Sequence, residues 1–298
     1  MKQLLIVALA AYSLCAGAQA VLAAGTTEIN NNLIGKPMQT TQAFPAAPNI
    51  STEFQVIEFR RYTIKSGGRE QFALYFESFF PEAFQQLGAI AFGQFFERGH
   101  PQGFTWLRGF PSMEARAIAN SAFYYGQVWK EHKATLNNLI EDSDNVYLMR
   151  PLSRERGLAV LPALDPVLEP QGAGGILVAQ LFAVKADQAD HFSRQAEAAF
   201  ASYRTAGLKE AGVLVTLDAP NNFPQLPVRS DGPYLLWLGM AQDQQMLNGV
   251  QHLLEQSARK LAETGMLVQT PELIIMDPSR RSRLRWPDSQ DKQTGGRQ

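Results

Sequence analysis

The order of predicted secondary structure occurs twice along this chain, and that repetition constrains the fold more than any other feature. Residues 54–152 show the hydrophobic patterns of a strand, a helix, two strands, a helix and a strand, and residues 175–286 show the same order. Residues 153–174 contain three prolines and end in glycine-rich sequence, which is typical of a linker. The chain is therefore predicted to be an α+β protein with two tandem repeats.

Each βαββαβ unit has the order of the ferredoxin-like motif, an antiparallel sheet with helices on one face. The uncovered face of each sheet needs a partner, which the other repeat supplies. In the first repeat the predicted strands are 55–64, 90–96, 104–110 and 145–152, with helices at 69–87 and 112–140. In the second repeat the predicted strands are 176–184, 212–217, 234–240 and 272–276, with helices at 187–206 and 243–263.

The composition is that of a globular protein with a core, since 45% of the residues are hydrophobic and 18% are charged. The formal net charge of −1 gives no overall attraction to nucleic acid or to an anionic membrane, so neither is an expected partner. The oligomeric state is left open by the sequence.

The N-terminus has the pattern of a secretory signal peptide. Lys2 is followed by an apolar run over 4–14 and then by Ala18-Gln19-Ala20, which resembles a cleavage site. The run is short for a bilayer span. We therefore expect residues 1–20 to be removed and the protein to be periplasmic or secreted, without a stable membrane anchor.

The single cysteine, Cys15, lies inside this segment, and lipidation there is the disfavoured alternative to cleavage. A mature chain without cysteine has no disulfide, thiol nucleophile or thiolate metal ligand. Residues 21–53 are predicted to be a flexible leader, and residues 287–298 a disordered tail.

Four runs in the first repeat carry a resemblance to a known family. They are residues 58–63 (EFRRYT), 105–116 (TWLRGFPSMEAR), 127–132 (QVWKEH) and 142–146 (DSDNV). In this order they resemble the NIPSNAP family over residues 55–152. The resemblance implies a dimeric α/β barrel, here formed within one chain by two ferredoxin-like units packed sheet to sheet. It implies no particular reaction.

Strand alternation places Glu58, Arg60 and Tyr62 on one face of the first strand, and Trp106 and Arg108 on one face of a later strand. We expect both sets to point into the barrel lumen, with Ile57 and Phe59 toward the helices. Such a lumen could bind an acidic or carbonyl-bearing small molecule through its arginines. The alternative is a structural ion-pair network at the interface between the repeats.

The second repeat lacks this polar set when the two repeats are aligned. Matching Lys185 with Lys65 and Gly239 with Gly109 puts five uncharged residues at the five positions: Val178, Gln180, Phe182, Leu236 and Leu238. A polar site is therefore predicted to belong to the first repeat alone.

A stripe of Tyr125, Val128, Trp129 and His132 follows helical spacing on the predicted long helix. His132 is either a general base or haem ligand, or the rim of an aromatic packing stripe. The candidate ligand-binding residues are thus Glu58, Arg60, Tyr62, Trp106, Arg108, Trp129 and His132.

Other chemistry has little support in the sequence. The histidines have no partners at metal spacing, and phosphate-loop, dinucleotide, nucleophile-elbow and zinc-protease motifs are absent, so we expect no metal and no cofactor. A basic run of Arg280, Arg281, Arg283 and Arg285 is either a phosphate or lipid-headgroup patch or, as we favour, a solvated end.

The leading hypothesis is an exported barrel that binds a small acidic or carbonyl-bearing ligand, with no reaction assigned by the sequence. The alternatives are a non-catalytic protein-interaction module and a cofactor-independent monooxygenase-like or haem-binding barrel. An enclosed pocket lined by first-repeat residues favours ligand binding, whereas a sealed interior with an exposed apolar patch favours interaction.

Overall fold

The computed structural model describes residues 53–159 and 161–287. The predicted signal peptide lies outside these residues, as do the predicted leader and tail except for Glu53 and Pro287. None of the helices within the described ranges combines the length and hydropathy that a membrane span needs.

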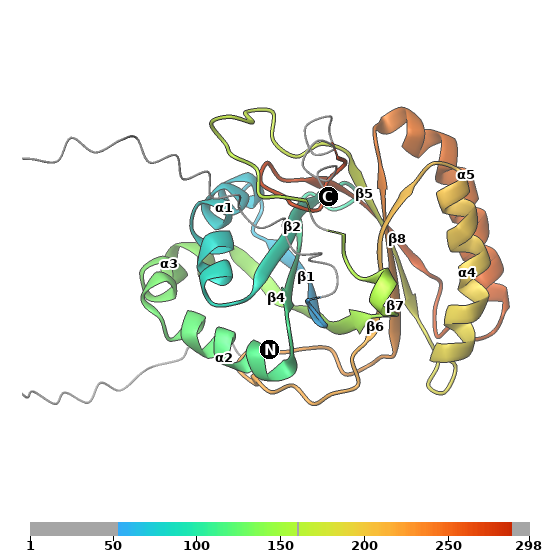
Figure 1. Cartoon of the computed structure of the whole chain (residues 1–298), viewed down its shortest axis with the longest axis horizontal. Helices are drawn as coiled ribbons and strands as arrows, with labels where there is room; N and C mark the ends of the chain where they lie inside the picture. The colour runs from blue at the N-terminus through green and yellow to red at the C-terminus, as the bar shows by residue number, and fades with distance from the viewer. Residues whose placement is uncertain (1–52, 160, 288–298) are drawn as a thin grey trace, which may run out of the picture. The chain divides into compact units, whose positions relative to one another are not determined.

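The first repeat has the predicted order of elements, with one difference in its second helix. Its strands are β1 (Val56–Ile64), β2 (Ile90–Glu97), β3 (Gly103–Phe110) and β4 (Ile140–Pro151). Its helices are α1 (Arg69–Gln86), α2 (Met113–Tyr124) and α3 (Gln127–Asn137), shown at the blue to green end of the chain in Figure 1.

The second repeat confirms the predicted order without interruption. After a short 3-10 turn, η2 (Arg154–Arg156), its strands are β5 (Ile176–Ala183), β6 (Lys209–Thr216), β7 (Tyr234–Ala241) and β8 (Glu272–Pro278). Its helices are α4 (Ala189–Thr205) and α5 (Gln244–Glu263).

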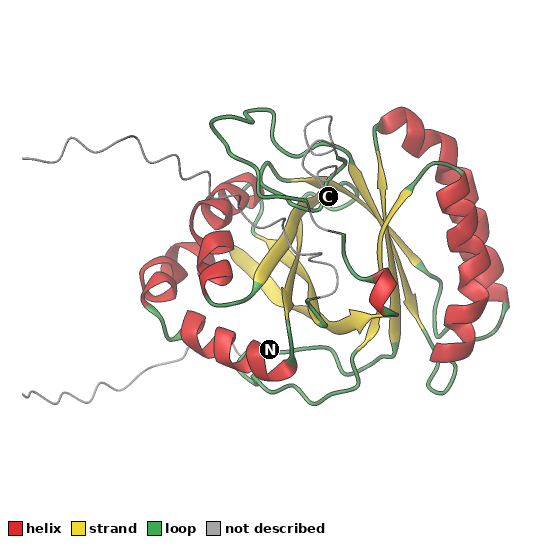
Figure 2. Ribbon diagram, in the orientation of Figure 1, coloured by secondary structure: helices red, strands yellow, loops and turns green. Residues whose placement is uncertain are grey.

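The eight strands form one closed barrel in the order β1-β3-β2-β8-β5-β7-β6-β4. Each repeat contributes four consecutive members of this ring, and all the pairings are antiparallel. Two short seams join the repeats: β2 pairs with β8, and β4 pairs with β6, over three residue pairs each. The helices lie outside the strands, α1–α3 beside the first repeat and α4–α5 beside the second (Figure 2). The predicted intrachain α/β barrel is confirmed.

The barrel lumen is an apolar core shared by the two repeats. Ile57, Phe59 and Leu107 meet Leu236 and Leu238 in one buried cluster. Two further apolar clusters lie between the sheet and the helices, one in each repeat. The molecule therefore has three apolar clusters, one in the lumen and one beneath the helices of each repeat, and β1, β3, β5 and β7 are buried on both faces.

The prediction that the polar set lines the lumen is wrong. Ile57 and Phe59 occupy the lumen, while Tyr62 and Trp106 lie in the cluster beneath α1–α3. The physical reason is that buried charged side chains need hydrogen-bond partners. Across the lumen the second repeat offers leucines and other apolar side chains, whereas the helix layer offers Arg116 of α2 as a hydrogen-bond partner. Buried charge lies where it can be hydrogen-bonded.

The predicted long helix over 112–140 is two helices, because the chain breaks at Tyr125 and Gly126. Ser112 caps α2 as predicted, its hydroxyl accepting from the Ala115 amide at 3.1 Å. A Cβ on Gly126 would overlap the carbonyl oxygen of Ala122, so this tight connection requires glycine. Tyr125 consequently leaves the predicted stripe and is exposed.

The basic run near the C-terminus is neither a free patch nor a solvated end. Arg281 pairs with Glu82 of α1, and Arg283 and Arg285 donate to carbonyl oxygens of the linker, at Leu161 and Pro162. Leu284, between them, is 1% exposed and belongs to the lumen cluster. The segment after β8 therefore holds the linker and α1 against the barrel, because its arginines form hydrogen bonds and an ion pair with oxygen atoms of both.

Candidate functional site

The polar residues of β1 and β3 converge beneath the helices of the first repeat. The antiparallel register places Glu58 opposite Arg108 and Arg60 opposite Trp106. Since alternate residues of neighbouring strands share a face, these four side chains and Tyr62 all point toward α1–α3. These residues therefore share one face of the sheet, as predicted, but it is the helix-covered face and not the lumen face.

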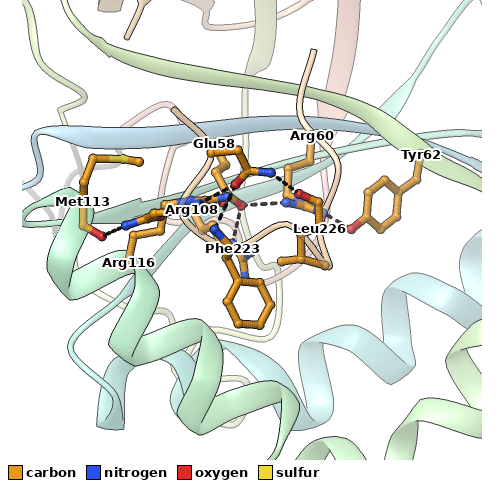
Figure 3. Close-up of polar contacts among 10 residues, drawn as sticks. Glu58, Arg60, Tyr62, Arg108, Met113, Arg116, Phe223 and Leu226 are labelled. Carbon is orange, nitrogen blue, oxygen red and sulfur yellow. Dashed lines mark hydrogen bonds and ion pairs between the residues drawn. The ribbon is translucent and has the colours of Figure 1, made fainter. Parts of the chain in front are cut away.

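Glu58 is the centre of this cluster and accepts three short hydrogen bonds. Arg60 Nη1 and Arg108 Nε both donate to its Oε2 at 2.6 Å, and Arg116 Nε donates to its Oε1 at 2.6 Å (Figure 3). Arg60 also donates through Nε to the Tyr62 hydroxyl at 3.0 Å. The four charged residues are at most 1% exposed.

Arg116, on α2, was not among the predicted site residues. A signal for it existed, because Arg116, Ala119, Asn120 and Phe123 form the buried face of α2 at spacings of three and four. A charged residue on the apolar face of an amphipathic helix must find a buried partner. The sequence does not say that this partner is Glu58, which lies 58 positions away.

Positive charge is in excess in this cluster. Three guanidinium groups share one carboxylate, and no other carboxylate in the described ranges hydrogen-bonds to any of the three. Both terminal nitrogens of Arg108 are buried without a hydrogen-bond partner among the residues that the structure describes. The Arg108 guanidinium instead lies 5.2–5.8 Å from the ring centres of Phe84, Trp106, Phe110 and Tyr124. These rings stabilise a cation only in part.

The ionisation states follow from burial and charge. Burial raises the pKa of Glu58, but the positive charges of Arg108, Arg60 and Arg116 outweigh it and hold that pKa well below its usual range. Burial raises the pKa of Tyr62 against the opposing effect of Arg60. Burial lowers the pKa of Arg116, and Glu58 opposes that shift. At neutral pH the carboxylate is charged and the Tyr62 phenol is neutral.

A small aromatic cavity adjoins the cluster. Its volume is about 30 Å³, which admits a water molecule. The side chains that line it come from the sheet and from all three helices: Tyr62, Phe72, Phe76, Phe80, Phe84, Trp106, Phe123, Tyr124, Trp129, Leu136 and Ile140. Tyr62, Trp106 and Trp129, three of the predicted ligand-binding residues, thus meet at one cavity.

His132 lies apart from this cavity. Its ring stacks on Phe79 at 3.8 Å between centres, and its Nδ1 is 2.8 Å from the Tyr75 hydroxyl. It therefore belongs to the packing between α1 and α3, as the rim of an aromatic stripe. No group of three potential metal ligands occurs among the described residues.

The register of the second repeat corrects one alignment. Val178 pairs with Gly239 and Gln180 pairs with Trp237, so Trp237 corresponds to Trp106 and Gly239 to Arg108. The second repeat thus keeps the tryptophan and loses the arginine. A Cβ on Gly239 would overlap the Trp237 ring, which leaves no room there for an arginine. Matching glycines misplaced the strand by one residue.

Comparison with known proteins identifies the first repeat. Residues 57–153 match the family model of NIPSNAP. The match runs from β1 to β4 and so includes the elements of the first repeat. No curated protein sequence matches the chain.

Several solved structures are similar in fold. An anthrone oxidase-like protein is 11% identical, with a TM-score of 0.50 over 78% of this chain and 95% of its own. A NIPSNAP family protein from Agrobacterium tumefaciens is 20% identical, with a TM-score of 0.31 over 33% of this chain and 94% of its own. A proposed monooxygenase from Lactobacillus acidophilus is 12% identical, with a TM-score of 0.49 over 76% of this chain and 94% of its own. Such identities concern the fold alone.

Proposed function

We propose, from the premise that residues 57–153 form a NIPSNAP domain, that this domain binds a small acidic ligand with an apolar body. The site lies between the sheet and the helices of the first repeat. The barrel lumen, where the sequence predicts the ligand, is filled by apolar side chains.

The unbalanced positive charge supports an acidic ligand over a merely carbonyl-bearing one. Arg60, Arg108 and Arg116 share a single carboxylate, that of Glu58, and the terminal nitrogens of Arg108 lack acceptors among the described residues. A buried cation without a counter-charge costs several kcal/mol. An anion beside Arg108 would supply both the charge and the acceptors, and a guanidinium fork suits a carboxylate.

The cavity supports an apolar body for the same ligand. Its lining is aromatic or aliphatic throughout and includes Trp106 and Tyr124, which also flank Arg108. At about 30 Å³ the cavity holds nothing larger than water. Binding therefore requires the helix layer to move outward, and α3 is the natural mobile element because only Leu136 among its residues is fully buried.

A thermal-shift measurement with matched probes tests the proposal. Benzoate should stabilise the full chain in proportion to its binding, whereas neutral benzamide, of the same shape, should not. Arg108→Leu should abolish the benzoate shift while keeping the melting temperature near or above that of wild type, because it removes excess buried charge.

Arg259→Leu, on the exposed surface of α5, is the matched control and should retain the benzoate shift. Equal shifts with benzoate and benzamide would show that charge is not recognised. A normal benzoate shift in Arg108→Leu would exclude Arg108 as the binding group. If Arg108→Leu unfolds and neither probe raises the melting temperature of wild type, the cluster is a structural ion-pair network.

A further inference from the structure

The loop between β6 and β7, residues 217–233, belongs to the second repeat in sequence but packs on the first. The backbone amides of Leu217 and Arg229 donate to carbonyl oxygens of β4, at Leu148 and Val146, over 3.0 and 2.8 Å. Leu217 and Val228 pack against the aromatic core beneath α1–α3. The loop is thus held in place at both ends by the repeat it crosses.

Two asparagines near the start of this loop, Asn221 and Asn222, accept hydrogen bonds from Arg116. Arg116 Nη1 donates to Asn222 Oδ1 at 2.8 Å and to Asn221 Oδ1 at 3.1 Å. Both amides are themselves oriented: Asn222 Nδ2 donates to the Met113 carbonyl at 2.5 Å, and Asn221 Nδ2 donates to the Leu226 carbonyl at 2.8 Å. These hydrogen bonds orient both amide oxygens toward the Arg116 guanidinium.

Phe223, the next residue in the loop, contacts the aromatic side chains of the site. The Phe223 ring stacks on Tyr124 with 5.9 Å between centres and 29° between planes, and Phe223 is 5% exposed. Tyr124 in turn lines the cavity and flanks Arg108. The loop thus meets the polar and the apolar halves of the same site.

The position of Arg116 decides how the Glu58 carboxylate is shared. With Arg116 Nε on Oε1, both Arg60 and Arg108 bond to Oε2, and Arg108 uses only its Nε. Without Arg116, Oε1 is an open acceptor within the same buried cluster, and a guanidinium such as that of Arg108 prefers a two-pronged pairing with a carboxylate. Arg108 would then turn its terminal nitrogens to Glu58 and away from a ligand.

We propose that the β6–β7 loop completes the acidic-ligand site of the first repeat, with Asn221 and Asn222 as positioning residues for Arg116. The inference rests on the proposed function for its effect on binding, although the positioning of Arg116 stands without a ligand. The site on the first repeat therefore depends on the second repeat for part of its affinity.

The double variant Asn221→Ala/Asn222→Ala in the full chain tests this, with Ser230→Ala, an exposed site in the same loop, as control. The first measurement needs no ligand. The side-chain Nε–H signal of Arg116, assigned with Arg116→Lys, should shift and exchange faster in the double variant and stay unchanged in the control. An unchanged Arg116 signal in the double variant overturns the inference.

The second measurement is the dissociation constant of benzoate. It should rise by about tenfold or more in the double variant, because Arg116 loses its charged hydrogen bonds to the two asparagines. It should not rise in Ser230→Ala. If wild type binds benzoate and the double variant binds it equally well, the loop does not serve the site. If wild type binds no probe, the proposed function fails, and the Arg116 signal alone decides whether the loop positions this residue.

Discussion

At the residue scale, Glu58 sets the electrostatic balance of the first repeat. Its carboxylate is completely buried and receives hydrogen bonds from Arg60, Arg108 and Arg116, each at 2.6 Å. The three arginines come from two strands and a helix, so one side chain holds β1, β3 and α2 together. Losing this charge leaves three buried cations facing one another.

We therefore expect Glu58→Gln to lower the free energy of unfolding at pH 7 by about 3–5 kcal/mol. The folded pKa of Glu58 lies well below its unfolded value of about 4.3, so the stabilisation by its charge is fully present above that pH. As pH falls below about 4 the stabilisation is lost, and the gap between wild type and variant should narrow.

Urea unfolding of both proteins between neutral and acid pH measures this gap. Glu263→Gln, at the exposed end of α5, is the control and should follow wild type at every pH. A gap that widens in acid would contradict the assigned ionisation of Glu58.

At the element scale, the break between α2 and α3 shapes the helix layer over the cavity. The turn at Gly126 lets α2 supply Phe123 and Tyr124 to the cavity while α3 supplies Trp129 and Leu136 from another direction. One continuous helix would carry these side chains around a single axis. The close approach of Gly126 to the Ala122 carbonyl makes this geometry dependent on one glycine.

Gly126→Ala should destabilise the protein by about 1–3 kcal/mol, because the new methyl group overlaps a backbone oxygen that cannot move independently. Gly249→Ala is the matched control, since a Cβ there meets nothing within 4 Å in the middle of α5. That change should stabilise the protein by up to about 1 kcal/mol through helix propensity. Calorimetric melting temperatures that move in the same direction for both variants would refute the steric explanation.

At the scale of the whole molecule, the two repeats depend on one lumen. The lumen cluster draws on strands of both repeats, yet each seam has only three residue pairs. Most of the stabilisation between the repeats therefore comes from buried apolar surface and not from strand pairing. The C-terminal segment adds Leu284 to the same cluster.

Residues 54–152 expressed alone should self-associate or aggregate, because the sheet would expose Ile57, Phe59 and Leu107. Light scattering and size-exclusion chromatography measure the assembly, with residues 53–287 as the control that retains both repeats. A monomeric fragment with a cooperative thermal transition would show that the lumen is not needed for folding.

Export is a separate prediction for the whole chain. We expect protein isolated from its native host to lack residues 1–20, because their charge, apolar run and alanine-rich end match a cleaved signal. Intact-mass spectrometry checks this. A mass that includes Met1 to Ala20 would refute the prediction.

The sequence by itself determined the order of the elements, most of their bounds and the two-repeat barrel. It also determined that Glu58, Arg60 and Tyr62 share a face. The element order, the bounds and the shared face follow from local chemistry: helical spacing of phenylalanines, strand alternation, and proline and glycine at the connections. The closed barrel was implied by the resemblance to the NIPSNAP family. Alternation, however, defines two faces without saying which faces the lumen, and here both faces are buried.

Only the tertiary structure decided where the site lies and what completes it. It placed the charged face beneath the helices, because the partner of Glu58 on α2 is there and the opposite sheet is apolar across the lumen. It also brought Asn221 and Asn222 of the second repeat to Arg116, more than a hundred residues away. Such contacts depend on the closure of the barrel and the path of a long loop, which no local pattern encodes.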